Sequence, residues 1–125
     1  MPQRWWAYLF GNRGERLAAR TLQAKGYRIL ARNCRNRFGE IDLIACDGET
    51  IVFVEVKTRS QTGSGRPEES ITAGKKRSLT RAASAWLHRY RLDHRRCRFD
   101  VVAILWREGQ PPEIEHYTSA FDATN

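Results

Sequence analysis

Two carboxylates and one lysine in the middle of the chain have the types and spacing that metal-assisted chemistry on phosphate requires. Asp42 lies in one β-like segment, and Glu55 and Lys57 lie in the next. Alternate residues of a strand share a face, so Glu55 and Lys57 point the same way. Carboxylates hold a hard divalent cation such as Mg²⁺ (or Mn²⁺) together with waters and phosphate oxygens. A lysine beside them can position water or stabilise charge on the phosphate.

The place of Asp42 depends on the hairpin that joins these two segments. Asp47-Gly48-Glu49 is a hairpin turn signal. A two-residue turn sets Asp42 either directly opposite Glu55 or diagonal to it, and both registers put Asp42 on the face of Glu55. A three-residue turn with a bulge would break this relation. The opposite face would carry only apolar residues, namely Ile41, Leu43, Ala45, Val52, Val54 and Val56.

Two opposed carboxylates need compensation, because like charges directly across a hairpin are destabilising. A bound cation would supply it. The alternative is an ordinary half-exposed strand on which Lys57 pairs with Glu55 or Asp42, since this spacing alone is weak support for function. Glu40 lies on the same face by parity, and we expect it to be solvated near the start of its strand.

The charge distribution favours a polyanionic partner. The net charge is +8, and the sequence pI is about 10.0. Residues 13–37 carry a net charge of +7 and residues 75–98 one of +8, whereas residues 38–74 carry −4. Two basic blocks around an acidic centre attract nucleic acid, and a solubilising surface is the alternative. The residues expected to contact nucleic acid are Arg13, Arg35, Arg37, Arg59, Arg66, Lys75, Lys76 and Arg81.

Hydrophobic spacing and turn signals predict the elements that position these residues. Helices are predicted over residues 11–25 and 75–90, and strands over 27–32, 39–46, 50–58, 98–106 and, at an edge, 113–117. Gly26 is a natural helix stop. The segment 59–67 is rich in Ser, Gly and Gln, which predicts a mobile loop that closes over nucleic acid or acts as a plain linker. The pattern favours an α/β or α+β sheet with helices packed against it.

Length and composition predict one cytoplasmic domain over residues 1–125. No apolar run approaches the ~20 residues that cross a membrane, and the N-terminus lacks the apolar stretch of a secretory signal peptide. Cys34, Cys46 and Cys97 are too few and too scattered for a disulfide framework. His94 and Cys97 have a ligand-like spacing without a second pair, so we expect ordinary thiols rather than a zinc site.

Several of these motifs together resemble one protein family. The sequence FGEIDLI over residues 38–44, followed by FVEVKTR over residues 53–59, is similar to the YraN-type family of uncharacterised bacterial proteins. That family resembles the PD-(D/E)XK nuclease superfamily, especially archaeal Holliday-junction resolvases. Further matching positions are Gly14-Glu15, Ala18-Ala19, Gly26-Tyr27, Asn33 and Phe99-Asp100-Val101-Val102. The resemblance covers nearly the whole chain and implies a restriction-endonuclease-like core, a mixed central β-sheet flanked by α-helices.

The resemblance also implies roles for the site residues. Asp42 and Glu55 would be metal ligands, and Lys57 would be the catalytic lysine. Glu15 matches the acid that similar resolvases bring to the metal from the first helix, whereas the alternative is a helix-start carboxylate favoured by the macrodipole. Two positions depart from the pattern. Ile41 stands where the superfamily has proline, and Lys75-Lys76 stands near the place where a glutamine is common.

The resemblance favours a metal-dependent endonuclease acting on branched or otherwise structured DNA. The alternative is a non-catalytic nucleic-acid-binding or adaptor protein on a nuclease-like fold. An RNA-associated protein is disfavoured, because the chain lacks an aromatic stacking motif of the RRM type. The sequence leaves the oligomeric state open, a homodimer included.

Overall fold

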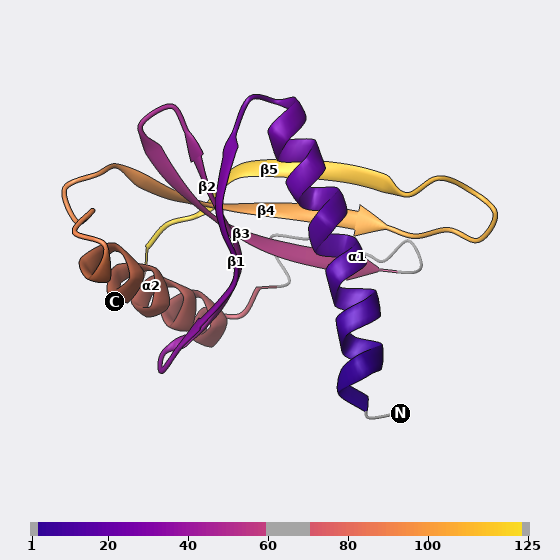
Figure 1. Ribbon diagram of the computed structural model, residues 1–125, viewed down its shortest axis with the longest axis horizontal. Helices are drawn as coiled ribbons and strands as arrows, with labels where there is room; N and C mark the ends of the chain where they lie inside the picture. The colour runs from indigo at the N-terminus through magenta and orange to yellow at the C-terminus, as the bar shows by residue number, and fades with distance from the viewer. Residues whose placement is uncertain (1–2, 60–70, 124–125) are drawn as a thin grey trace.

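Within the described residues, two helices and five strands follow one another along the chain (Figure 1). The structure is a computed structural model that describes residues 3–59 and 71–123, with only the backbone described for residues 3–12. The elements are α1 (Gln3–Ala24), β1 (Arg28–Asn36), β2 (Gly39–Asp47), β3 (Thr50–Arg59), α2 (Ala73–Arg89), β4 (Cys97–Leu105) and β5 (Glu113–Phe121). Residues 60–70, which include Arg66 and most of the predicted loop, lie outside the described residues.

The five strands form one mixed sheet in the order β1-β2-β3-β4-β5. Neighbouring strands are antiparallel except β3 and β4, which run parallel on either side of α2 in the sequence. Parallel neighbours need such a crossover connection, because a tight turn can join only antiparallel strands. The prediction of a mixed sheet with helices packed against it is confirmed.

The two helices cover opposite faces of the sheet, and each face has its own apolar core (Figure 1). Ala18, Ala19 and Leu22 of α1 pack against one face. Leu79, Ala82, Ala83 and Leu87 of α2 pack against the other face. Most of β4 is buried because it lies between β3 and β5 under both helices. The acidic residues of β2 and β3 therefore lie in strands whose backbones are held from both sides.

The turn between β2 and β3 has the two-residue form that the sequence allows. Asp47 pairs with Thr50, and Gly48 has a φ of 60°, a backbone conformation that favours glycine. The paired residues continue to Leu43 opposite Val54, in the register that would set Asp42 directly opposite Glu55. Of the two registers that were open, the structure selects this one.

The face assigned to Ile41 is wrong. Leu43, Ala45, Val52 and Val54 lie under α1 as predicted, but Ile41 packs in the α2 core. The β2–β3 pairing stops at Leu43, so the alternation of side chains does not continue unbroken to Ile41. Strict alternation holds only while a strand stays regular.

Several elements are longer than predicted. The helix predicted from residue 11 begins at Gln3, because residues 3–10 contain neither glycine nor proline to break it. The first strand continues from residue 32 to Asn36, through Asn33 with its positive φ of 50°. The last strand reaches Phe121, whose ring stacks on Phe99 with centroids 4.9 Å apart. These extensions come from contacts between elements, which local propensity does not report.

Candidate active site

Asp42 lies where β2 separates from β3. Its Oδ2 accepts a hydrogen bond of 2.8 Å from the backbone N–H of Val56. A side-chain oxygen thus takes the place that a backbone carbonyl would have in a continued ladder. This hydrogen bond holds the Asp42 carboxylate against β3, one residue beyond Glu55.

Glu55 is a buried carboxylate with poor compensation. It is 8% exposed, and its Oε2 accepts no hydrogen bond from the described residues. The Lys75 Nζ lies 3.6 Å from that oxygen, beyond a normal hydrogen bond. Burial is the largest cause that raises the Glu55 pKa, to about 8. A hydrogen bond with the Asp42 side chain and repulsion from its charge also raise this pKa, whereas Lys75 and Lys57 lower it. Glu55 therefore tends to keep its proton near neutral pH when no cation is bound.

Asp100 on β4 shows what a compensated buried carboxylate looks like in the same protein. It is fully buried, and it accepts hydrogen bonds from His116 Nε2 at 2.7 Å, Arg98 Nε at 3.0 Å and the backbone N–H of Ser119 at 3.0 Å. Burial alone would raise the Asp100 pKa, but the bonds from His116, Arg98 and Ser119 outweigh it and lower the pKa. Asp100 is therefore a satisfied structural anion, whereas Glu55 is not.

Two lysines border the acidic pair from different elements. Lys57 is half-buried and lies two residues after Glu55 on β3, on the same face by alternation. Lys75 comes from the first turn of α2, and its side chain is 43% exposed. Both charges lower the Glu55 pKa, with Lys75 the stronger. The two lysines thus place positive charge near Glu55.

Glu15 approaches Asp42 from α1. The preceding residue, Gly14, lets α1 pack very close to β3, since a Cβ there would lie 2.9 Å from Thr58 Cγ2. Burial and repulsion from Asp42 raise the Glu15 pKa, and Asn33 acts in the opposite direction through a hydrogen bond. The structure thus places Glu15 within electrostatic reach of Asp42. Over residues 3–59 and 71–123, however, no three His, Cys, Asp or Glu side chains meet the geometry of a metal-binding cluster.

The basic residues predicted to contact nucleic acid do not form one uniform group. Arg81 is exposed on α2, and Arg59 is half-buried at the end of β3. Arg13 stacks over Trp106, and Lys76 lies over the ring of Phe121. Lys75 instead belongs to the acidic site through its contact with Glu55. Arg35 and Arg37 lie near the end of α2 that is farther from Lys75. Arg66 is outside the described residues.

Sequence reasoning missed the role of Lys75 as a partner of Glu55. The signal was the N-cap at Thr72, whose side-chain oxygen accepts a hydrogen bond of 3.1 Å from the Lys75 backbone N–H. A Thr before a predicted helix fixes the helix start, and therefore which lysine lies in the first turn. The contact of that turn with Glu55 is tertiary, and no local sequence pattern predicts it. Glu40 has the solvated role expected of it, in an exposed ion pair of 3.2 Å with Arg35.

Comparison with known proteins identifies the family of this chain. The model of a family described as "Uncharacterised protein family UPF0102" matches residues 14–104. This chain belongs to the UPF0102 family. A UPF0102 protein of Geobacter sulfurreducens is 48% identical over 114 residues, covering 91% of this chain and 89% of the relative. A UPF0102 protein of Rhodococcus opacus is 49% identical over 111 residues, covering 89% of this chain and 94% of the relative.

The UPF0102 match includes the whole candidate site. Residues 14–104 contain Glu15, Asp42, Glu55, Lys57 and Lys75, together with the strands and helices that hold them. The match stops before β5, the edge strand that completes the Asp100 network through His116. No helix among the described residues of this UPF0102 protein has the length and apolar character to span a membrane.

Proposed function

We propose that this UPF0102 protein is a metal-dependent endonuclease that hydrolyses phosphodiester bonds of DNA, with branched or otherwise structured DNA as its substrate. The observation that carries the proposal is the pair of the half-buried Asp42 and the buried Glu55. Asp42 raises the Glu55 pKa against the lowering effect of two lysines, and Glu55 Oε2 has no hydrogen-bond partner among the described residues. Strongly perturbed carboxylates beside lysines are characteristic of functional sites. The net charge of +8 supports a polyanionic substrate.

The donor set fits a small hard cation. Asp42 has Oδ2 engaged by the Val56 N–H, and Glu55 has an unbonded oxygen in Oε2. Mg²⁺ needs no more than one or two carboxylates from the protein, because waters and phosphate oxygens complete its octahedron. Asp42 and Glu55 would hold the ion. Glu15 would add negative charge on the Asp42 side.

The residues around this pair have separable tasks in the proposed reaction. A bound Mg²⁺ or Mn²⁺ would supply Lewis-acid polarisation of the phosphodiester. Lys57 would donate a hydrogen bond to a phosphate oxygen and stabilise the charge that develops there. Lys75 would shield Glu55 before substrate binds, since it lies near the buried oxygen while half of its own side chain stays in water. The strands beneath these groups keep their spacing fixed.

Cleavage of a DNA panel with Mg²⁺ or Mn²⁺ tests the proposal. Blunt duplex, duplex with a single-stranded end and a four-way junction would be incubated with wild type, Glu55→Gln, Lys57→Ala and, as a matched control, Glu49→Gln in the exposed turn. We expect each site variant to cleave about 100-fold or more slowly and Glu49→Gln to cleave like wild type. Equal cleavage by wild type and Glu55→Gln would contradict the assignment.

Calorimetric titration with Mn²⁺ examines the metal site without relying on turnover. Wild type should take up the ion weakly, and Asp42→Asn should lose that uptake because one of the two carboxylates is gone. Unchanged binding in Asp42→Asn would place the metal elsewhere.

A non-catalytic nucleic-acid-binding protein is the second candidate. It is favoured by the absence of a three-residue metal cluster among the described side chains, and by Ile41 in place of the superfamily proline. DNA binding by wild type without Mn²⁺ uptake or cleavage of any substrate would favour this function. The basic surface would then act without turnover.

A further inference from the structure

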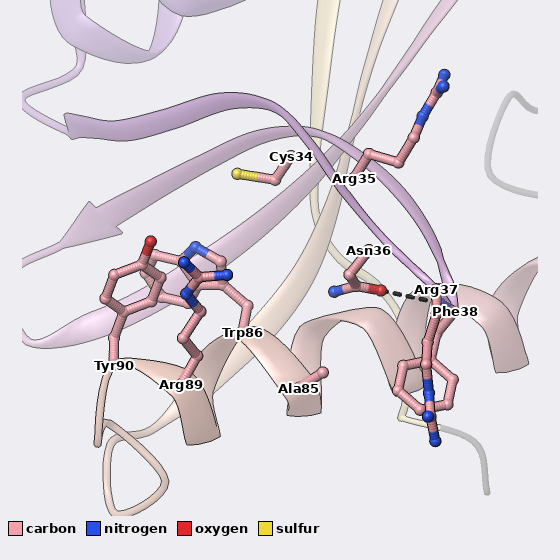
Figure 2. Close-up of a pocket in the computed structure, with 9 residues that line it drawn as sticks. All are labelled: Cys34, Arg35, Asn36, Arg37, Phe38, Ala85, Trp86, Arg89 and Tyr90. Carbon is pink, nitrogen blue, oxygen red and sulfur yellow. Dashed lines mark hydrogen bonds between the residues drawn. The ribbon is translucent and has the colours of Figure 1, made fainter.

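A groove lies between the end of β1 and the last turns of α2, at the opposite end of α2 from Lys75 (Figure 2). We call it the α2 groove. One wall comes from residues 34–38, and the other comes from Ala85, Trp86, Arg89 and Tyr90. Its volume is about 380 Å³, within the range of about 300–1,000 Å³ that small-ligand pockets occupy. Neither acid of the proposed active site lines it.

Aromatic side chains form one end of the α2 groove. Tyr90 is 53% exposed, more than the other large aromatic side chains that the structure describes, and its centroid lies 5.0 Å from that of Trp86. Trp86 in turn contacts Phe53 of the core edge to face, with centroids 6.0 Å apart. The outer ring thus rests on an inner ring that the core holds in place. Such a rigid and exposed aromatic platform suits a planar ligand.

Arginines line the same groove. Arg37 lies over the ring of Phe38 at 4.8 Å, and Arg89 lies over the ring of Tyr90 at 5.7 Å. Stacking of this kind keeps a guanidinium flat and leaves its N–H groups at the edge, where they can bind phosphate. Arg35 is the groove arginine that has an ion pair within the described residues, with the exposed Glu40. Figure 2 shows Trp86, Arg89 and Tyr90 rising from α2 toward β1, with Arg37 and Phe38 farther along.

Asn36 fixes the two walls relative to each other. Its Nδ2 donates a hydrogen bond of 3.1 Å to the Ala82 carbonyl of α2. Its Oδ1 accepts one of 3.0 Å from the Phe38 backbone N–H, the dashed line in Figure 2. One side chain therefore ties the β1–β2 turn both to itself and to the helix. A groove held in this way is preformed, so a ligand does not have to order it.

The α2 groove and the acidic pair lie on the same side of α2. Lys75, which contacts Glu55, and Trp86 are both on this helix, and both side chains face the sheet side. Lys75 and Trp86 are eleven residues apart, which at about 1.5 Å per residue is about 16 Å along the axis of α2. Their directions around that axis differ by only about 20°. That length corresponds to about five nucleotide steps of a DNA strand whose bases keep the ~3.4 Å stacking distance of a duplex.

We propose that the α2 groove binds an unpaired base of single-stranded DNA, stacked on Tyr90, while Arg37 and Arg89 hold its phosphates. The proposal rests on the proposed function for the nature of the polymer and adds the feature of the substrate that is recognised. A strand that ends or branches near the groove would place its duplex about five nucleotides away, at Asp42 and Glu55. A second copy of this chain fits less well, because an isologous contact would bring the same arginines together.

Fluorescence anisotropy in EDTA tests this inference without metal or cleavage. Three probes share one short duplex: blunt, with a single-stranded DNA overhang of about five nucleotides, and with an abasic overhang that keeps the phosphates but lacks the bases. Wild type should prefer the base-bearing overhang. Tyr90→Ala should bind that probe about tenfold more weakly and should bind the other two like wild type. Tyr90→Phe should retain the preference, because the ring rather than the hydroxyl stacks.

Arg20→Ala is the matched control, since it removes an exposed positive charge from α1 on the other face of the sheet. It should leave the preference among the three probes as in wild type. Equal binding of the base-bearing probe by wild type and Tyr90→Ala would overturn the proposal, and so would a preference confined to RNA overhangs. A dimer in sedimentation that Tyr90→Ala converts to monomer would also overturn it, in favour of a contact between copies. A wild-type protein that prefers the base-bearing overhang but cleaves no DNA would contradict the proposed endonuclease activity and leave the proposed role of the groove standing.

Discussion

At the scale of single residues, two buried carboxylates with opposite environments separate structure from chemistry. Asp100 accepts hydrogen bonds from a histidine, an arginine and a backbone N–H, and its pKa is lowered. Glu55 has an acid beside it and one lysine at 3.6 Å, and its pKa is raised to about 8. Desolvation acts on both, so the difference lies in the partners. A site that leaves negative charge uncompensated is prepared for a cation from outside.

Glu55 should make the metal-free protein less stable as the pH rises. Its folded-state pKa, about 8, exceeds its ordinary value of 4.5, so the folded state binds the proton more tightly. Its contribution is therefore fully present below about pH 4.5 and is lost as the pH rises to about 8, at a slope of at most about 1.4 kcal/mol per pH unit. Urea denaturation from pH 5 to 9 should show this loss in wild type. It should be much smaller in Glu55→Gln.

Glu49→Gln serves as the control for that measurement, because Glu49 is exposed in the hairpin turn. It should follow the wild-type pH dependence. A Glu55→Gln protein that loses stability with pH as steeply as wild type would show that Glu55 ionises normally in the folded state. Addition of Mn²⁺ at high pH should stabilise wild type more than Glu55→Gln, because an ion that binds only the folded state raises its stability by mass action.

At the scale of elements, the site depends on where two elements end. β2 leaves the ladder at Asp42, so its carboxylate rather than its backbone meets β3. α2 begins just after Thr72, which caps the Lys75 N–H, and the first turn of this helix reaches Glu55. A shift of either end by one residue would point a different side chain at the site, because both strands and helices rotate their side chains with every residue.

Thr72→Ala should loosen the start of α2. Loss of an N-cap oxygen costs about 1 kcal/mol, with a range of roughly 0.5–2, and we expect a lower Tm by a few degrees. The same change should also raise the Glu55 pKa further, because Lys75, which lowers it, is held less firmly. Thermal melts and the pH dependence of stability measure the two effects. Thr72→Ser keeps the cap oxygen and should behave like wild type in both. A full wild-type Tm for Thr72→Ala would show that the cap contributes nothing.

At the scale of the whole molecule, the net charge of +8 is only partly available to a ligand. Arg98 is committed to Asp47 and Asp100, and Lys75 is committed to Glu55. Arg37 and Arg81, by contrast, are exposed, and no ion pair of theirs is found within the described residues. Basic residues of the same type therefore differ in what they can give to nucleic acid, since a charge already paired gains less from a phosphate.

Salt dependence measures how many of these charges DNA uses. If about five phosphates are contacted, a plot of log K against log salt should have a slope of about −4 to −5. The double variant Arg37→Ser, Arg81→Ser should flatten the slope by up to about 1.8, or 0.9 for each lost contact. Arg20→Ser, Arg28→Ser removes two other exposed charges and is the matched control. Its slope should stay near wild type. Affinity that does not change between low and moderate salt would contradict electrostatic binding.

The sequence by itself determined the features that depend on near neighbours. A two-residue turn at Gly48 and the alternation along residues 43–54 limited the β2–β3 hairpin to two registers, one of which the structure has. Spacing of about 3.6 residues predicted most of α2, and the separation of charged blocks was visible without coordinates. These predictions succeeded because backbone geometry repeats over a few residues, and so the pattern that reports it is local.

Only the tertiary structure decided the contacts between these elements that form the candidate site. Ile41 packs on the α2 face rather than the predicted α1 face, because β2 separates from β3 at Asp42. No pattern in the sequence marks that point. Lys75 meets Glu55, and Asn36 meets Ala82, because α2 packs back across the sheet after a crossover. The α2 groove exists only between these two elements. Such pairs lie twenty to forty-six residues apart in the chain, and the packing of whole surfaces, rather than any local preference, sets their distances.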